Sequence, residues 1–293
     1  MKIITYRWGG RRHAGRLSHD GREVVPLSLG ERGLQVGALA LVEAMADGGT
    51  VPRAAGPALP LSAVQLEAPL PAPRRNLFCV GINYRPHAQE FAASGFNATP
   101  VAAGQEVPDH PVIFTKVPEC VIAPGAAIVI PSDVSTAIDY EAELAVVIGR
   151  GGRGIPASRA LEHVFGYTIV NDVTARDLQR RHRQWVIGKS LDSFGPMGPC
   201  IVTADELDGT DTRLRCWING ELRQDARSSE LVFGIGPLIE ALSAGLTLYP
   251  GDVIATGTPS GVGIGFDPPK FLLRGDTVRI EIDGIGVLEN PVA

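Results

Sequence analysis

One segment of the sequence joins two carboxylates to a long apolar run, and it limits what the chain can fold into. Glu141 and Glu143 are followed directly by Leu144–Ile148, in which every residue is apolar. The run predicts a buried β-strand, in which residues two apart point to the same side of the sheet. The fold must therefore either leave both glutamates in water at the strand end or neutralise two like charges beside an apolar surface.

A divalent cation would neutralise the two charges in the second arrangement. Ligands that are all oxygen atoms favour Mg²⁺ or Mn²⁺, with Ca²⁺ as a further alternative, over zinc. The other arrangement, an exposed strand end with two solvated glutamates, is the usual environment of glutamate. The pattern by itself leaves both interpretations open.

The composition is that of a globular protein. Apolar residues make up 44% of the 293 residues, which excludes intrinsic disorder. A formal net charge of −5 argues against a general nucleic-acid binder and against a membrane-surface protein. Neither a signal peptide nor a membrane span is predicted, and the spacing of the four cysteines fits no metal or redox motif. We therefore expect a cytoplasmic protein with buried free thiols.

Residues 1–74 are predicted to form a small N-terminal α/β domain that ends in a linker. A strand over Lys2–Trp8 and a hairpin precede one predicted helix over Gln35–Ala46. Two Pro/Ala-rich stretches between residues 52 and 73 are typical of a semi-rigid linker.

Residues 75–293 are predicted to form an α+β, mostly β domain. Short apolar strands alternate with glycine turns, and Asn219-Gly220 is typical of a type I′ hairpin. Helices are expected only after Pro86, after Asn171 and near residues 231–244. This spacing favours a curled or rolled sheet over a regular βαβ array.

Two glycine motifs imitate nucleotide-binding loops without meeting their requirements. Gly188-Lys189-Ser190 resembles the end of a P-loop, but Arg183 occupies the position of the required upstream glycine. Gly261–Gly265 resembles a dinucleotide fingerprint, but no helix pattern follows, and Pro268-Pro269 would break one. We therefore expect neither a phosphate-binding loop nor a nicotinamide cofactor.

His87 and Glu90 form a candidate acid–base pair. Pro86 predicts a helix start, and residues three apart on a helix can touch. A carboxylate beside an imidazole orients the ring and raises its basicity, as a general base requires. An ordinary surface pair has the same spacing.

Asp172, Arg176 and Gln179 follow a predicted strand at spacings that would place them on one helix face. If that face lines a site, Asp172 is a third metal carboxylate, and Arg176 and Gln179 are substrate-binding residues. If it does not, Asp172 is an N-cap and the other two face solvent.

Three further groups allow a functional and an ordinary interpretation. Lys189 has apolar neighbours that would lower its pKa, or it is a solvated lysine. Thr258 lies in a Gly/Thr turn that can hold an anionic oxygen, or the turn is merely tight. Lys116 and the basic run over residues 180–183 are expected in solvent, although Lys116 can reach a substrate carboxylate.

Six segments match known sequences in their order along the chain. They are CVGINYRPH at 79–87, IDYEAELAVVIG at 138–149, GYTIVNDVTARDLQ at 166–179, GKSLDSFGPMGP at 188–199, LYPGDVIATGTPSGVG at 248–263 and LLRGDTVRIEIDGIGVLENPV at 272–292. Taken together, residues 76–293 resemble the fumarylacetoacetate hydrolase family.

The resemblance implies a mixed β-sandwich roll, usually a homodimer, with a divalent metal held by three carboxylates. Carried over to this sequence, the metal ligands are Glu141, Glu143 and Asp172. Lys189 and the pair His87–Glu90 are then catalytic. Gln179 is then the residue that orients water or substrate, and Thr258 the residue that binds the substrate carboxylate.

The sequence departs from the family pattern at two places. Ile82 stands where many acylpyruvase-like members have a basic residue, which affects recognition of the distal end of the substrate. The segment over residues 91–110 is longer than in compact members, and we expect it to reshape the lid over the site.

The hypothesis from sequence is a metal-dependent hydrolase that cleaves a C–C bond in a β-diketo acid such as an acylpyruvate. The alternative on the same fold is a 2-oxo acid decarboxylase or an isomerase of the 2-hydroxyhepta-2,4-diene-1,7-dioate type. A non-catalytic binding protein is a third class, but a complete set of catalytic side chains argues against it. The expected partner is a small oxo acid, with no nucleic acid and no membrane.

Overall fold

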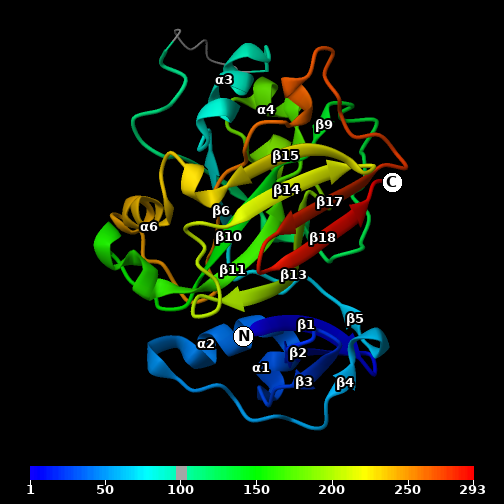
Figure 1. Cartoon of the computed structure of the whole chain (residues 1–293), viewed down its shortest axis with the longest axis vertical. Helices are drawn as coiled ribbons and strands as arrows, with labels where there is room; N and C mark the ends of the chain where they lie inside the picture. The colour runs from blue at the N-terminus through cyan, green and yellow to red at the C-terminus, as the bar shows by residue number, and fades with distance from the viewer. Residues whose placement is uncertain (97–103) are drawn as a thin grey trace.

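The computed structural model describes residues 1–96 and 104–293 and is mostly β (Figure 1). The strands are β1 (Lys2–Trp8), β2 (Arg11–Leu17), β3 (Glu23–Pro26), β4 (Leu59–Pro60), β5 (Gln65–Leu66), β6 (Leu77–Gly81), β7 (Val112–Lys116), β8 (Val121–Ile122), β9 (Ile138–Asp139), β10 (Ala142–Ile148), β11 (Val164–Asn171), β12 (Thr174–Ala175), β13 (Gly195–Thr203), β14 (Arg213–Ile218), β15 (Glu221–Arg227), β16 (Val253–Ala255), β17 (Thr277–Ile282) and β18 (Gly286–Pro291). The α-helices are α1 (Gly30–Val36), α2 (Ala38–Met45), α3 (Arg85–Ala93), α4 (Arg176–His182), α5 (Val186–Lys189) and α6 (Ile235–Ser243). The predicted α+β, mostly β class is confirmed.

Two sheets pack face to face. The larger has the order β4-β3-β2-β1-β13-β11-β10-β16-β6-β7, and it is mixed because β16 and β6 run parallel. The smaller, β15-β14-β17-β18, is antiparallel. Inward side chains of β10, β14 and β17 share one apolar cluster. The result is the β-sandwich that the family resemblance implies.

Strand β10 is buried along its whole length because both of its faces are covered. Leu144 and Val146 face the sandwich core, whereas Ala145 and Val147 pack in a second cluster with the side chains of α2. Strands with antiparallel neighbours, here β11 and β16, commonly alternate apolar and polar residues because one face meets solvent. Strand β10 has no such alternation because neither of its faces meets solvent.

The N-terminal strands extend the larger sheet. β1 pairs antiparallel with β13, where Ile3 lies opposite Ile201. The predicted single helix over Gln35–Ala46 is wrong, because Gly37, at φ 62°, separates α1 from α2. The division of the chain at residue 74 stays a prediction.

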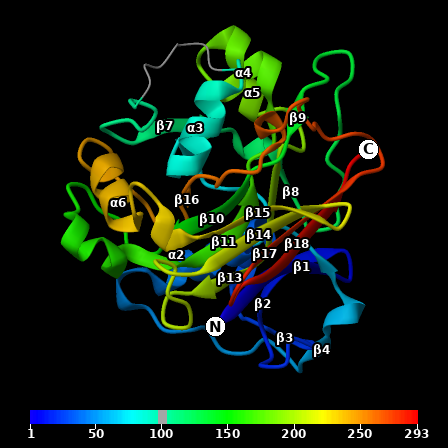
Figure 2. The same cartoon turned by 45° about the horizontal axis from the view of Figure 1, so that its top comes forward.

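Helices α3, α4 and α5 gather at the end of the sandwich away from the N-terminal strands (Figures 1 and 2). The expected helices near Pro86 and after Asn171 are present as α3 and α4. Asn219-Gly220 forms the predicted hairpin between β14 and β15, with both residues at positive φ. Within the segment predicted to reshape the lid, residues 97–103 lie outside the described part of the chain.

The four cysteines are buried and free, as expected. In the described part of the chain, no helix has the length and apolar character that crossing a bilayer requires.

Candidate active site

The ends of β10 and β11 meet at a cluster of three carboxylates. Ala142 lies opposite Asn171 in the antiparallel register, which places Glu141, Glu143 and Asp172 side by side. One oxygen from each carboxylate lies within 4.8 Å of the others, and all three residues are buried. This burial excludes the solvated strand end as an interpretation of the two glutamates.

Basic side chains compensate two of the three carboxylates. The Nζ of Lys189 lies 2.6 Å from Glu141 Oε2 and 2.8 Å from Asp172 Oδ2. The Nζ of Lys116 donates to Asp172 Oδ1 at 2.7 Å, and Arg176 Nη1 lies 2.7 Å from Glu141 Oε1. Glu141 and Asp172 therefore each contact two cations.

Glu143 lacks this compensation. Among residues 1–96 and 104–293, no basic side chain forms an ion pair with it, and the Gly257 N–H donates to its Oε2 at 2.8 Å. Burial, together with Asp172 and Glu141, raises the pKa of Glu143 well above its ordinary value. Burial acts in the same direction on Glu141, but Lys189 lowers the pKa of Glu141 to about 2. None of the three basic groups forms an ion pair with Glu143, so the oxygen donors of the cluster fit a divalent cation placed beside it.

We expect the affinity for Mg²⁺ or Mn²⁺ to rise with pH. Below its raised pKa, Glu143 is protonated in the metal-free protein, and a carboxylate must ionise to coordinate a cation. Binding must therefore release a proton, and titration calorimetry in two buffers of different ionisation enthalpy measures that release. Glu143→Gln, which lacks both this proton and a metal-binding carboxylate, is the control, and it should give little binding heat in either buffer. Identical binding enthalpies in both buffers would contradict the assignment.

The candidate acid–base pair lies on the first turns of α3. His87 Nδ1 lies 3.0 Å from Glu90 Oε2, and Glu90 Oε1 accepts the Gly261 N–H at 2.9 Å. His87 is 5% exposed and lines the same pocket as the carboxylate cluster. Because Nδ1 faces a carboxylate, it carries the proton in the neutral ring, and Nε2 is the free acceptor.

Gly265 makes room for Glu90. A Cβ at residue 265 would lie 1.7 Å from Glu90 Oε1, so a side chain there must displace the carboxylate. We expect Gly265→Ala to lower the turnover rate about 10-fold to 100-fold, the size of effect seen when a partner that orients a functional group is lost. Its melting temperature should change little, because only a flexible carboxylate has to move.

Gly245→Ala is the matched control for this substitution. A Cβ at residue 245 meets no atom within 4 Å, and its backbone needs no positive φ. Steady-state kinetics on both variants checks the effect. Parental turnover in Gly265→Ala would show that the position of Glu90 is unimportant.

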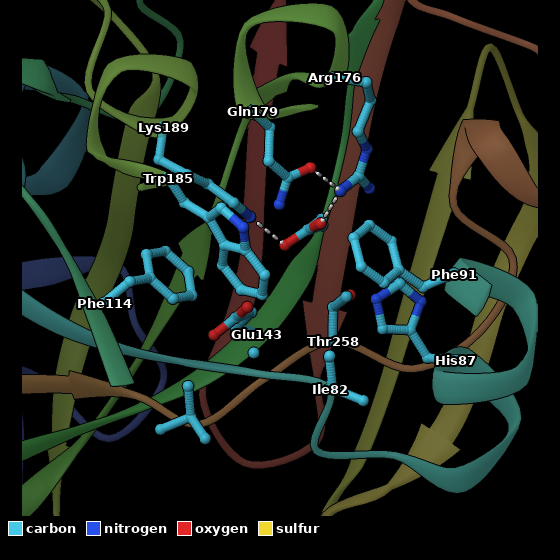
Figure 3. Close-up of a pocket in the computed structure, with 13 residues that line it drawn as sticks. Ile82, His87, Phe91, Phe114, Glu143, Arg176, Gln179, Trp185, Lys189 and Thr258 are labelled. Atoms are coloured by element: carbon cyan, nitrogen blue, oxygen red, sulfur yellow. Dashed lines mark hydrogen bonds and ion pairs between the residues drawn. The ribbon is translucent and has the colours of Figure 1, made fainter. Parts of the chain in front are cut away.

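A narrow pocket lies over the cluster (Figure 3). Its lining residues are Val80, Gly81, Ile82, His87, Phe91, Phe114, Glu141, Glu143, Arg176, Gln179, Trp185, Lys189 and Thr258. The ring of Trp185 packs at 6.0 Å from Phe91 and 5.1 Å from Phe114 between centroids, edge to face. Gly81 admits this ring, since a Cβ there would lie 2.3 Å from it. The pocket is therefore lined by charged and aromatic side chains together, and the Nζ of Lys189 lies 5.0 Å from the centroid of the Phe114 ring.

Several donors in the pocket remain free for a substrate. Lys189 uses two of its three N–H groups, and Arg176 Nη2 is buried without a partner among the described residues. Gln179 accepts from Arg176 through its oxygen, which leaves its amide nitrogen free to donate. The hydroxyl of Thr258 accepts from Gln224 Nε2 at 2.8 Å, so its own hydrogen can point elsewhere. Such a set suits carboxylate and carbonyl oxygens.

Two predictions about the placement of these residues are wrong. Asp172 does not share a helix face with Arg176 and Gln179, because α4 begins only at Arg176 and its N-cap is Ala175. Lys116 neither faces solvent nor lines the pocket. It is fully buried, and it donates to the backbone carbonyl of Val173 as well as to Asp172. Its positive charge balances the buried carboxylate of Asp172.

The predicted direction of the Lys189 pKa is also wrong. Burial alone lowers the pKa, but the carboxylates of Asp172 and Glu141 outweigh it and raise the pKa above its ordinary value. The lysine is therefore a resident cation of the cluster.

Four further residues serve the site although they were not among the residues predicted for it: Asp139, Phe114, Trp185 and Gly265. Asp139 Oδ2 accepts from Arg176 Nε at 2.9 Å and so positions that guanidinium. The two-residue period that paired Glu141 with Glu143 extends to Asp139 and was a usable signal. The aromatic wall and Gly265 had no local signal, because their partners are distant in sequence.

Comparisons with known proteins agree on one family. A model described as "Fumarylacetoacetate (FAA) hydrolase C-terminal" matches residues 76–293. Over 233 residues the chain is 49% identical to "Oxaloacetate tautomerase YisK" of Bacillus subtilis (strain 168), covering 79% of this chain and 74% of that protein. Over 239 residues it is 41% identical to "Oxaloacetate tautomerase FAHD2A, mitochondrial" of Homo sapiens, covering 80% and 72%.

Solved structures give the same picture. A fumarylacetoacetate hydrolase from the psychrophile Exiguobacterium antarcticum superposes with a TM-score of 0.83 at 38% identity, covering 100% of this chain and 99% of that chain. The 5-carboxymethyl-2-hydroxymuconate delta-isomerase from Mycobacterium smegmatis has a TM-score of 0.79 at 38% identity, with the same coverage.

Proposed function

Because the chain belongs to the fumarylacetoacetate hydrolase family, we propose that it is a metal-dependent tautomerase of small 2-oxo dicarboxylic acids of the oxaloacetate class. The observation that carries the proposal is that His87, which contacts Glu90, lines the same pocket as Glu141 and Glu143, two members of the carboxylate cluster. Tautomerisation moves one proton between the enol oxygen and the carbon next to the one that bears this oxygen, with a shift of the double bond, and it consumes no water.

The relatives favour this isomerase-type reaction over hydrolysis. Two similar proteins carry the name oxaloacetate tautomerase, and one of the solved relatives is an isomerase. The hydrolase hypothesis from sequence is supported by the family name and by one solved relative that is a hydrolase. The alternative of the sequence analysis, the isomerase, therefore becomes the main proposal.

We assign the metal site to Glu141, Glu143 and Asp172, and propose Mg²⁺ or Mn²⁺ as the ion. When bound, the ion supplies positive charge that stabilises negative charge on the substrate oxygens. Lys189 holds Glu141 and Asp172 in place and presents its third N–H to the same region.

The remaining polar groups bind and orient the substrate carboxylates. The free Nη2 of Arg176 and the amide of Gln179 donate from α4, and Thr258 donates from the turn after β16. The rings of Phe91, Phe114 and Trp185 are apolar surfaces. They exclude water from the carbon chain of the substrate.

His87 carries the proton. In the direction from enol to ketone, the neutral Nε2 accepts the proton of the enol hydroxyl. The C–O bond becomes the carbonyl while the C=C electrons form a C–H bond at the other alkene carbon, with the proton that the imidazolium returns. Glu90 stabilises the imidazolium during the transfer through Nδ1. The ring ends as it began, so the reaction balances without a co-reactant.

An enol-decay assay tests the proposal. Chelator-treated protein is mixed with the enol form of oxaloacetate, with and without added Mg²⁺ or Mn²⁺, and the loss of enol absorbance is followed. Pyruvate release from oxaloacetate and cleavage of acetylpyruvate are measured in parallel. We expect metal-restored enol decay that is far faster than either side reaction. If acetylpyruvate is cleaved while enol decay is not accelerated, the tautomerase proposal is wrong and the hydrolase hypothesis is supported instead.

A further inference from the structure

Helix α4 carries more arginines than the pocket uses. Arg176 and Gln179 line the pocket, and Arg180 follows Arg176 by four residues on the same side of the helix. Arg183, seven residues after Arg176, follows the last helical residue. We use the name arginine track for Arg176, Arg180 and Arg183 together. Figure 2 shows α4 beside α3, the helix that carries His87.

The outer end of the arginine track opens to solvent. Arg180, Arg181 and Arg183 are exposed, and together with Phe96 and Asp177 they line a hollow on the surface. Phe96 lies three residues after the end of α3, so the hollow lies between the ends of the two helices that supply the pocket. The basic run is solvated, as the sequence predicts, but it is gathered at one place.

These outer arginines have no acidic partner. In the part of the chain that the structure describes, no carboxylate lies within 4.0 Å of their guanidinium groups. Asp177, the acid in the hollow, accepts from the hydroxyl of Ser135 at 2.6 Å instead. Residues 97–103 contain no Asp or Glu. The hollow is therefore positive, on a protein whose formal net charge is −5.

The inner end of the arginine track also has a free donor. Arg176 Nε donates to Asp139 and its Nη1 contacts Glu141, but Nη2 is buried without a partner among the described residues. A buried donor without a partner is costly, and an incoming carboxylate removes that cost. Donors are thus available at both ends of one helix face.

We propose that Arg180 and Arg183 form an electrostatic capture site for small dicarboxylate dianions, which then pass along the helix to Arg176. The proposal rests on the proposed function for the class of substrate. A cluster of like charges raises the local concentration of an oppositely charged ligand and speeds its association, and salt screens this effect. The basic residues also complement the C-terminal end of the helix dipole, but that role affects stability and leaves association rates unchanged.

Stopped-flow binding of oxalate to the Mg²⁺-loaded protein tests the capture site. Oxalate is a dianion that needs no turnover, and fluorescence of Trp185 in the pocket reports its arrival. We expect Arg180→Gln/Arg183→Gln to lower the association rate constant about tenfold at low salt. The dissociation rate should stay the same, and the difference from the parent should vanish near 1 M salt.

Arg11→Gln/Arg16→Gln is the control with the same change in net charge. Both arginines are exposed on β2, outside the pocket and the hollow. We expect this pair to leave the association rate unchanged. A parental rate and salt dependence in the α4 variant would overturn the proposal, and so would an equal loss in the control. Since oxalate binding is independent of catalysis, a failed enol-decay assay would reject the proposed function without deciding this question.

Discussion

Replacing Glu143 with glutamine is expected to abolish metal-dependent turnover. The substitution keeps the shape of the side chain and removes the only carboxylate of the cluster that forms no ion pair among the described residues. A metal ion contributes several kcal/mol to stabilising charge in a transition state, which corresponds to roughly a thousandfold in rate. The enol-decay assay with added Mg²⁺ or Mn²⁺ measures the loss.

The same variant should be more stable than the parent when metal is absent. The pKa of Glu143 is raised in the folded protein by burial, Asp172 and Glu141, so the unfolded chain releases this proton more readily and the fold loses stability as the pH rises above 4.5, the ordinary value. Glutamine has no such proton. The gain should disappear at pH values below 4.5, because Glu143 is then protonated in the folded and unfolded states alike.

Thermal unfolding at several pH values, with and without metal, separates the two effects. We expect metal to raise the melting temperature of the parent and to leave that of Glu143→Gln nearly unchanged. Glu240→Gln is a control, because this acidic residue is exposed on α6 and lies outside the pocket. A variant that loses stability at pH 8, or that still responds fully to metal, would contradict the assigned role of Glu143.

Local periodicity was enough to place Glu141 and Glu143 on one side of a strand, although it left open whether the two carboxylates bind a metal or face solvent. A run of five apolar residues can only be a buried strand or helix segment, and the two-residue period places Glu141 and Glu143 on one side of it. The mostly β class followed from glycine turns between short strands. These features depend on neighbours in sequence, which is why they were available before the fold was known.

Features that depend on long-range register could not be predicted in this way. Asp172 reaches the cluster because β11 runs antiparallel to β10 with Asn171 opposite Ala142, and no local pattern specifies that pairing. Lys116 resembled a solvated lysine at the end of a short strand, yet its partner Asp172 is 56 residues away. The family resemblance supplied the ligand set that local physics left open.

Replacing His87 with glutamine is expected to lower the tautomerase rate by about 10²-fold to 10⁴-fold, the usual contribution of a positioned acid–base group. Glutamine retains a hydrogen-bonding side chain but cannot accept and return a proton near neutral pH. Glu90→Gln should cause a smaller loss, because His87 keeps its ring and loses only the charge that stabilises its protonated form. The enol-decay assay measures both rates at a saturating concentration of Mg²⁺.

His87→Gln and Glu143→Gln act on separate parts of the site, and this separation makes the mechanism testable. His87→Gln leaves the Glu141–Glu143–Asp172 cluster intact, so metal should still raise its melting temperature as in the parent. Pyruvate release from oxaloacetate breaks a C–C bond without the proton shuttle, so any such activity should survive in His87→Gln and disappear in Glu143→Gln. If His87→Gln converts enol at the parental rate, the proton moves through another group, and the pair on α3 only shapes the pocket.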